Sequence, residues 1–184
     1  MEGGVDAVTM RAVGRRLGVA PNALYSHVAD RAELIDALLD DVLAAVPAPS
    51  VAAGDPVRSL HELLSATYEV LAAHPGLVPV YLSRQGARGP NAALLGRVMD
   101  DLLKEAGVEA VDVAVARRVL IVHAMGSAAF AAGALAEPGA DHPLSVAESQ
   151  EVFVRGLNWL LAGIVRDDID TGGTSPDWGG TSVS

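Results

Sequence analysis

Apolar residues along most of the chain recur every three or four positions, which is the spacing of one face of an α-helix. Leu34, Leu38 and Val42 follow this spacing and predict a long helix over residues 31–46. Asp30 stands just before it, and aspartate is favoured at helix amino termini. Since the same spacing continues through most of the sequence, we predict an all-α protein.

Further helices are expected beyond a connection rich in proline and glycine at residues 47–56. Their approximate ranges are 57–71, 77–85, 94–103, 111–135 and 145–165. Ser145, with Glu148 three residues later, resembles a capping box. We predict a first domain at residues 1–46, a helical domain at 47–166 and a disordered tail at 167–184, which is rich in Gly, Ser, Thr and Asp.

The helix at 111–135 is unusually apolar. From Val119 to Ala136 it carries no formal charge apart from any on His123. We interpret it as a buried helix and not as a membrane span, because it is rich in small residues and no second candidate span exists. Its small residues Ala128, Ala129, Ala132 and Gly133 would allow close helix contact at a subunit interface.

Residues 9–28 predict a helix-turn-helix. Two short helices joined by a glycine turn are the geometry that lays one helix across a phosphate backbone and the next in a major groove. The residues that indicate it are the cap Thr9, the apolar pairs Val13 with Leu17 and Leu24 with Val28, the turn residue Gly18 and the helix-opening Pro21. A helical hairpin used only for packing is the alternative.

The stretch from Thr9 to Leu34 resembles the DNA-binding module of the tetracycline-repressor (TetR) family of transcription regulators. The residues that carry the resemblance are Thr9, Val13, Leu17, Gly18, Val19, Leu24, Tyr25, His27, Val28, Arg31, Glu33 and Leu34. Two positions depart from the family pattern. Ala20 stands where a capping serine is common, at a local cost of about 1 kcal/mol, and Arg31 stands where lysine is common.

The resemblance also implies a helix before the hairpin, which residues 1–8 are too short to supply. Three explanations stay open: a wrongly assigned start, a chain shortened at its amino terminus, or a regulator that has lost DNA binding. The first two are favoured.

From the resemblance we expect an all-helical homodimer that binds a palindromic operator in double-stranded DNA. The last two long helices of each subunit would form a four-helix bundle with those of the partner. Candidate phosphate contacts are Thr9, Tyr25, His27 and Arg31, candidate base contacts are Asn22, Ala23 and Ser26, and Arg11 is a further DNA-binding candidate.

The charge distribution fits this expectation. The 184 residues carry a formal net charge of −10, which at first argues against a DNA-binding protein. Residues 1–31, however, hold four arginines against three acidic residues, so the negative charge lies in the rest of the chain. A relatively basic head on an acidic body suits a protein that meets phosphate at one end only.

Catalytic chemistry has no support in the sequence. It contains no cysteine, no helical zinc motif among its five histidines, no phosphate-binding glycine loop and no nucleophile elbow. We therefore expect no enzyme activity, no metal and no cofactor. Nothing resembles a signal peptide, so we expect a cytoplasmic protein that contacts no membrane.

The resemblance further implies a small-molecule effector held between the helices of the second domain. The candidate contacts are Tyr68, Tyr81, Arg84, Met99, His123, Met125, Phe130 and Trp159. Core packing is the alternative for the apolar ones, and a hydrogen-bonded core histidine is the alternative for His123. Because aromatic residues make up only 4% of the chain, a flexible or alicyclic apolar ligand is favoured. The function predicted is a ligand-released repressor, and the alternative is a sensor or scaffold dimer that no longer binds DNA.

Overall fold

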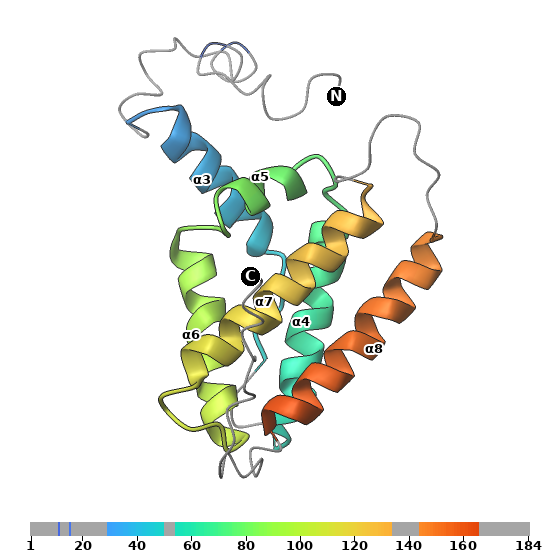
Figure 1. The fold of residues 1–184 in the computed structure, drawn as a ribbon. Helices are drawn as coiled ribbons and strands as arrows, with labels where there is room; N and C mark the ends of the chain where they lie inside the picture. Colours follow the sequence, from blue (N-terminus) through green and yellow to red (C-terminus); the bar gives the residue numbers. More distant parts are fainter. Residues whose placement is uncertain (1–10, 12–14, 16–28, 50–53, 134–143, 166–184) are drawn as a thin grey trace, which may run out of the picture.

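The computed structural model describes residues 29–49, 54–133 and 144–165, together with Arg11 and Arg15. These segments are helical and contain no strand, which confirms the all-α prediction. The helices are α3 (Arg31–Leu43), α4 (Pro56–Ala72), α5 (Val78–Ser83), α6 (Pro90–Glu105), α7 (Val113–Ala131) and α8 (Val146–Val165). α4 packs against α6, α7 and α8, and the short α5 lies between α3 and α7 at one end of the bundle (Figure 1).

Several helix starts follow from side-chain caps. The Asp30 carboxylate accepts a hydrogen bond from the backbone N–H of Glu33 at 2.9 Å, which begins α3. Ser145 and Glu148 form the predicted capping box, with bonds of 2.7 Å and 3.2 Å between each side chain and the other residue's N–H. The Glu148 pKa is lowered by these bonds to Ser145.

Two helices end at least three residues before their predicted ends. α3 ends at Leu43, because Ala44, Ala45 and Val46 turn more tightly, with each N–H bonded to the carbonyl three residues earlier. α7 ends at Ala131, where Gly133 makes the same kind of bond to Phe130.

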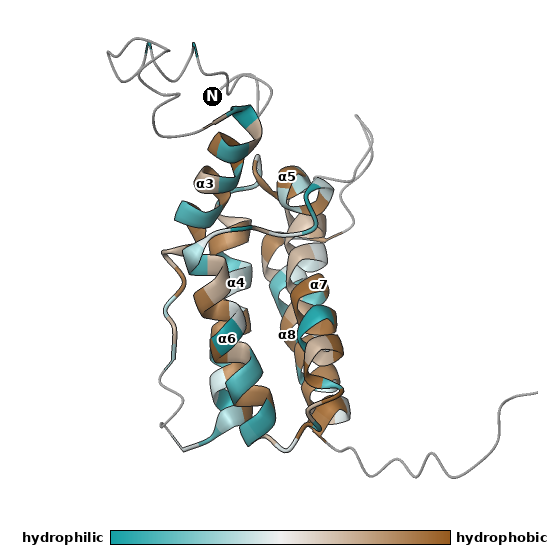
Figure 2. Ribbon diagram, turned by 90° about the vertical axis from the view of Figure 1, so that its left-hand side faces the viewer, coloured by the Kyte–Doolittle hydropathy of each residue, from teal (hydrophilic) through white to brown (hydrophobic). Residues whose placement is uncertain are grey.

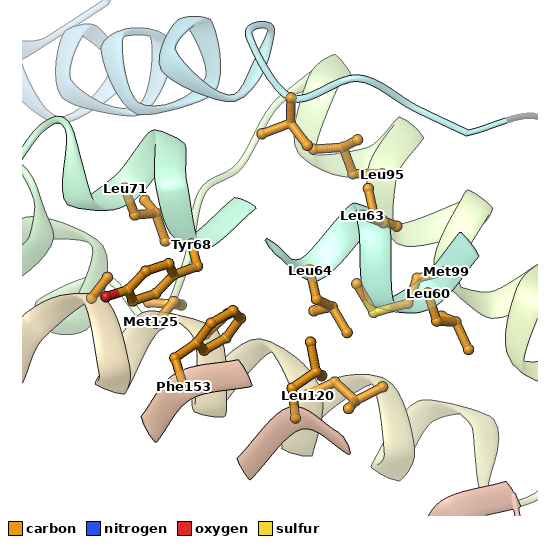
Figure 3. Close-up of a cluster of buried hydrophobic side chains, with 14 of the residues drawn as sticks. Leu60, Leu63, Leu64, Tyr68, Leu71, Leu95, Met99, Leu120, Met125 and Phe153 are labelled. Atoms are coloured by element: carbon orange, nitrogen blue, oxygen red, sulfur yellow. The ribbon is translucent and has the colours of Figure 1, made fainter. Parts of the chain in front are cut away.

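The core is built around α4. Its residues Leu60, Leu63, Leu64, Tyr68 and Leu71 are all buried. Figure 3 shows Tyr68 facing Phe153 of α8, and the two rings stack with centroids 4.2 Å apart. The core therefore ties α8 to α4 as well as to α7.

α7 is the one helix in the described part of the chain that is long and apolar enough to cross a membrane by length and composition. It packs against α4, α5, α6 and α8. Ala128 and Ala129 are fully buried within the subunit, so the expectation that they serve a subunit interface is wrong. The opposite side of α7 is exposed at Val115, Val119 and Val122.

His123 of α7 fixes the approach of α8. Its Nε2 donates a hydrogen bond to the carbonyl oxygen of Phe153 at 3.0 Å, and its ring stacks on the Phe153 ring with centroids 5.2 Å apart. A Cβ at Gly156 would lie 2.6 Å from His123 Cε1, so the close contact requires glycine there. These contacts make His123 a hydrogen-bonded core histidine, which was one of its two interpretations.

We expect Gly156→Ala to lower the free energy of unfolding by about 1–3 kcal/mol, because the His123 ring must shift and its bond to Phe153 is strained or lost. Gly163→Ala on the same helix is the control. A Cβ there meets nothing within 4 Å, and replacing a helical glycine gains roughly 0.5–1 kcal/mol. Urea unfolding of both variants measures the difference, and equal effects would contradict the packing described.

Candidate functional site

A cavity of about 180 Å³ lies where α3, α4, α5, α6 and α7 meet. It is lined by Leu43 of α3, Leu64, Thr67 and Leu71 of α4, Tyr81 of α5, Gln85, Gly86 and Ala87 of the next connection, Ala92, Leu95, Gly96 and Met99 of α6, and Ile121 and Met125 of α7. Figure 3 shows part of this region, with Leu71, Leu95, Met99 and Met125 among the labelled side chains. An apolar cavity of similar size, about 150 Å³, is large enough for benzene.

The polar groups of the cavity wall are mostly engaged. Thr67 Oγ1 donates a hydrogen bond to the Leu63 carbonyl at 2.8 Å, and the Tyr81 hydroxyl donates one to the Leu39 carbonyl. The side-chain amide of Gln85 makes no hydrogen bond within the described segments. A ligand here would be held mainly by apolar contacts, with Gln85 able to fix one polar atom.

α5 connects this cavity to α3. Tyr81 lines the cavity and bonds to the backbone of Leu39, while Arg84 one turn later forms a two-bond ion pair with Asp36 of α3. The Nε to Oδ1 distance of that pair is 2.5 Å. The hydrogen bonds from Arg84 lower the pKa of Asp36, which keeps this partly exposed carboxylate ionised.

A second link joins α3 to α6. The Asp40 side chain of α3 is buried and accepts hydrogen bonds from the N–H of Ala92 at 2.8 Å, the N–H of Asn91 at 3.1 Å and Asn91 Nδ2 at 3.0 Å. Asp40 thereby caps the amino terminus of α6. Gly89, the residue just before α6, has no side chain that could form this cap. A Cβ at Gly89 would lie within 2.7 Å of both Asp40 carboxylate oxygens, and its φ of 150° also favours glycine.

The structure separates the predicted effector contacts into three groups. Tyr81, Met99 and Met125 line the cavity. Tyr68 and His123 belong to the core around Phe153, and Arg84 is paired with Asp36, so none of these three lines it. Phe130 and Trp159 are 72% and 71% exposed on the outside of the subunit, away from the residues that line the cavity.

The predicted DNA contacts lie at the other end of the chain. Arg11 and Arg31 are exposed, and Arg31 is the first residue of α3. The remaining candidates, Thr9, Asn22, Ala23, Tyr25, Ser26 and His27, are outside the residues that the structure describes.

The Tyr81 link makes a prediction about alkaline stability. Burial, with a smaller effect from the charge of Asp40, raises the pKa of Tyr81 to about 12. An unfolded tyrosine ionises near pH 10, so the stability contributed by this proton is complete below about pH 10 and is lost as the pH rises towards about 12. Tyr81→Phe should lower the free energy of unfolding by about 1 kcal/mol at pH 7 and should reduce its decline between pH 10 and 12.

Tyr68→Phe is the control for the hydrogen bond. Burial also raises the Tyr68 pKa, but its hydroxyl bonds to no group in the described segments. Urea unfolding at pH 7 should leave this variant close to the unchanged protein. An equal loss of unfolding free energy in both variants would show that the hydrogen bond of the Tyr81 hydroxyl does not stabilise the fold.

Comparisons of the sequence and of the fold with known proteins both find bacterial regulators. Residues 1–38 match the sequence model of a family described as bacterial regulatory proteins, tetR family. No curated protein sequence matches the chain. ActR of Streptomyces coelicolor in complex with actinorhodin superposes with a TM-score of 0.70 at 25% identity, over 89% of this chain and 89% of ActR.

Two other solved structures are similar. BioQ of Mycobacterium smegmatis superposes with a TM-score of 0.68 at 25% identity, over 85% of this chain and 86% of BioQ. BioQ has also been solved with its natural double-stranded DNA operator. The Streptomyces regulator SCO7704 has a TM-score of 0.64 at 27% identity, over 92% of this chain and 89% of that protein. The sequence match at the amino terminus and the similarity in fold thus both point to bacterial regulators of the tetR kind.

Proposed function

We propose that this chain is a TetR-family transcriptional regulator and not an enzyme, and that it acts as a repressor that an effector releases from DNA. Its homodimer binds an inverted-repeat operator in the cytoplasm, and a small apolar molecule in the α3–α7 cavity causes release. The solved complexes of BioQ with its operator and of ActR with actinorhodin support a protein of this kind.

The observation that carries the proposal is the path from the cavity to α3. Leu43 of α3 lines the cavity directly. Tyr81 of α5 is bonded to Leu39 of α3, and Arg84, which follows α5, is bonded to Asp36 of α3. α3 begins only a few residues after the helix-turn-helix predicted at residues 9–28. A ligand that favours a different seating of α5 would therefore displace α3 and the DNA-binding head with it.

Such a displacement matters because a dimeric helix-turn-helix protein reads two half-sites about 34–36 Å apart. A change in the spacing of the two heads makes simultaneous insertion into successive major grooves unfavourable. The effector then needs only a higher affinity for the state that does not fit the operator.

The dimer is proposed to form through α7 and α8, which pack against each other within the subunit. Hydrophobic colouring predominates along these two helices in Figure 2, whereas α6 has hydrophilic positions on its outer side. The exposed apolar residues proposed to form this contact are Val119 and Phe130 of α7 and Val152 and Trp159 of α8, between 40% and 72% exposed. An apolar surface of this kind on a single subunit indicates a protein–protein contact.

Replacement of Tyr25 tests the DNA-binding part of the proposal. Tyr25→Ala should weaken binding to a duplex that the protein enriches from a random pool by about tenfold or more, since it removes a proposed phosphate contact. The variant should remain a dimer, which sedimentation verifies. Unchanged affinity in fluorescence anisotropy would count against the assigned recognition helix.

A further inference from the structure

A second, more open hollow of about 810 Å³ lies between α5 and α7, and we call it the α5–α7 groove. It is lined by Leu82, Gln85, Arg88, Ala114, Val115, Arg117, Arg118, Ile121, Val122, Met125 and Gly126. Apart from Gln85 and three arginines, these residues are apolar or glycine, and none is acidic. The groove thus combines an apolar floor with three guanidinium groups in a chain whose net charge is −10.

The three arginines differ in how far their charge is already compensated. Arg117 Nη1 is paired with Asp100 Oδ2 at 2.6 Å. Arg88 Nη1 donates one hydrogen bond to the Arg84 carbonyl at 3.1 Å. The charge of Arg88 also acts on the Asp36 carboxylate, but that carboxylate is already paired with Arg84. Arg118 is exposed and forms no ion pair with any described residue. Arg118 and Arg88 therefore present free N–H donors to the groove.

The groove adjoins the α3–α7 cavity. Gln85, Ile121 and Met125 line both, so the two hollows meet at these side chains. A molecule with its apolar body in the cavity could extend past them into the groove. Its other end would then lie near the guanidinium groups.

We propose that the effector is an apolar molecule with one anionic end, a carboxylate or a phosphate, and that Arg118 and Arg88 bind this end. This inference rests on the proposed effector cavity and names the ligand class that it takes. Guanidinium groups bind carboxylates and phosphates through paired, charge-assisted hydrogen bonds. The cavity of about 180 Å³ accepts a body close to the size of benzene, and the remainder of the molecule occupies the groove.

Four molecules with the same eight-carbon chain test the proposal by calorimetry on the full dimeric chain: octanoate, octyl phosphate, 1-octanol and octylamine. The two anions should bind at least tenfold more tightly than the alcohol, and the amine should bind most weakly. Arg118→Ala should lower the affinity for the anions about tenfold, or about 1.4 kcal/mol, and leave that for the alcohol unchanged. Arg118→Lys keeps the charge and should retain part of the preference.

Arg97→Ala is the matched control, since Arg97 is an exposed arginine of α6 that lines neither hollow. It should leave all four affinities unchanged. Tighter binding of octanoate would point to a carboxylate effector, and tighter binding of octyl phosphate to a phosphate.

Three results would overturn the inference: no binding of either anion, no preference for the anions over the alcohol, or a preference that survives Arg118→Ala. Failure of the proposed function looks different. If the anions bind through Arg118 but the protein selects no DNA, the repressor proposal is wrong and the proposed ligand class is retained. If only neutral molecules release the protein from DNA, the proposed ligand class is wrong and the repressor proposal is retained.

Discussion

Replacing Asp40 with alanine should lower the free energy of unfolding by about 3 kcal/mol, a large effect for a single polar side chain. The carboxylate is buried and accepts three hydrogen bonds from Asn91 and Ala92 at the start of α6. Its removal leaves these donors without their acceptor and takes away an inter-helix cap, each of which costs about 1–2 kcal/mol. For a chain of this length the midpoint of thermal unfolding should fall by about 6–12 °C.

The neighbouring Asp41 supplies the control, because it is exposed and its side chain bonds to no group in the described part of the chain. Asp41→Ala should change the free energy of unfolding by less than about 0.5 kcal/mol. Chemical denaturation of both variants gives the comparison. A loss for Asp40→Ala no greater than that for Asp41→Ala would mean that Asp40 does not cap α6.

Replacing Trp159 with glutamate should separate the proposed homodimer into monomers and lower operator affinity about a hundredfold or more. Trp159 is 71% exposed in the single subunit and lies on α8, within the proposed dimer surface. In a two-fold symmetric contact the substitution occurs twice, and it places two unpaired charges in an apolar interface, at a cost of several kcal/mol. A monomer can occupy only one half-site at a time, so the operator complex loses the gain from linking two heads.

Sedimentation and fluorescence anisotropy measure the two effects, with Ala93→Glu as control. Ala93 is exposed in the first turn of α6, outside the proposed dimer surface, and a glutamate near a helix amino terminus is favourable. This control should remain dimeric and bind DNA normally. A Trp159→Glu protein that stays dimeric would place the subunit contact elsewhere.

The helical fold could be predicted well from the sequence, because the signals that set it are local. The apolar spacing of residues such as Leu60 and Leu64 predicted α4, and Asp30 and Ser145 predicted the starts of α3 and α8. The ends of α3 and α7 were predicted too far along, since tightening of a last turn leaves no mark in the apolar pattern.

The candidate site was predicted only in part, since its organisation depends on contacts between distant segments. Tyr81, Met99 and Met125 were identified as effector contacts and line the cavity. No feature of the sequence pairs Asp40 with Asn91 or Arg84 with Asp36, so both links to α3 were missed. Phe130 and Trp159 were assigned to a pocket because they are large and apolar, a property that a subunit surface shares.

Selection from a pool of random duplex DNA is the decisive experiment for the proposed repressor. The chain should enrich an inverted repeat, with half-sites whose centres lie about one helical turn of DNA, or a multiple of it, apart. Sedimentation in the same buffer verifies that the protein is a folded dimer. A folded dimer that enriches no sequence would contradict the repressor proposal and favour a sensor that does not bind DNA.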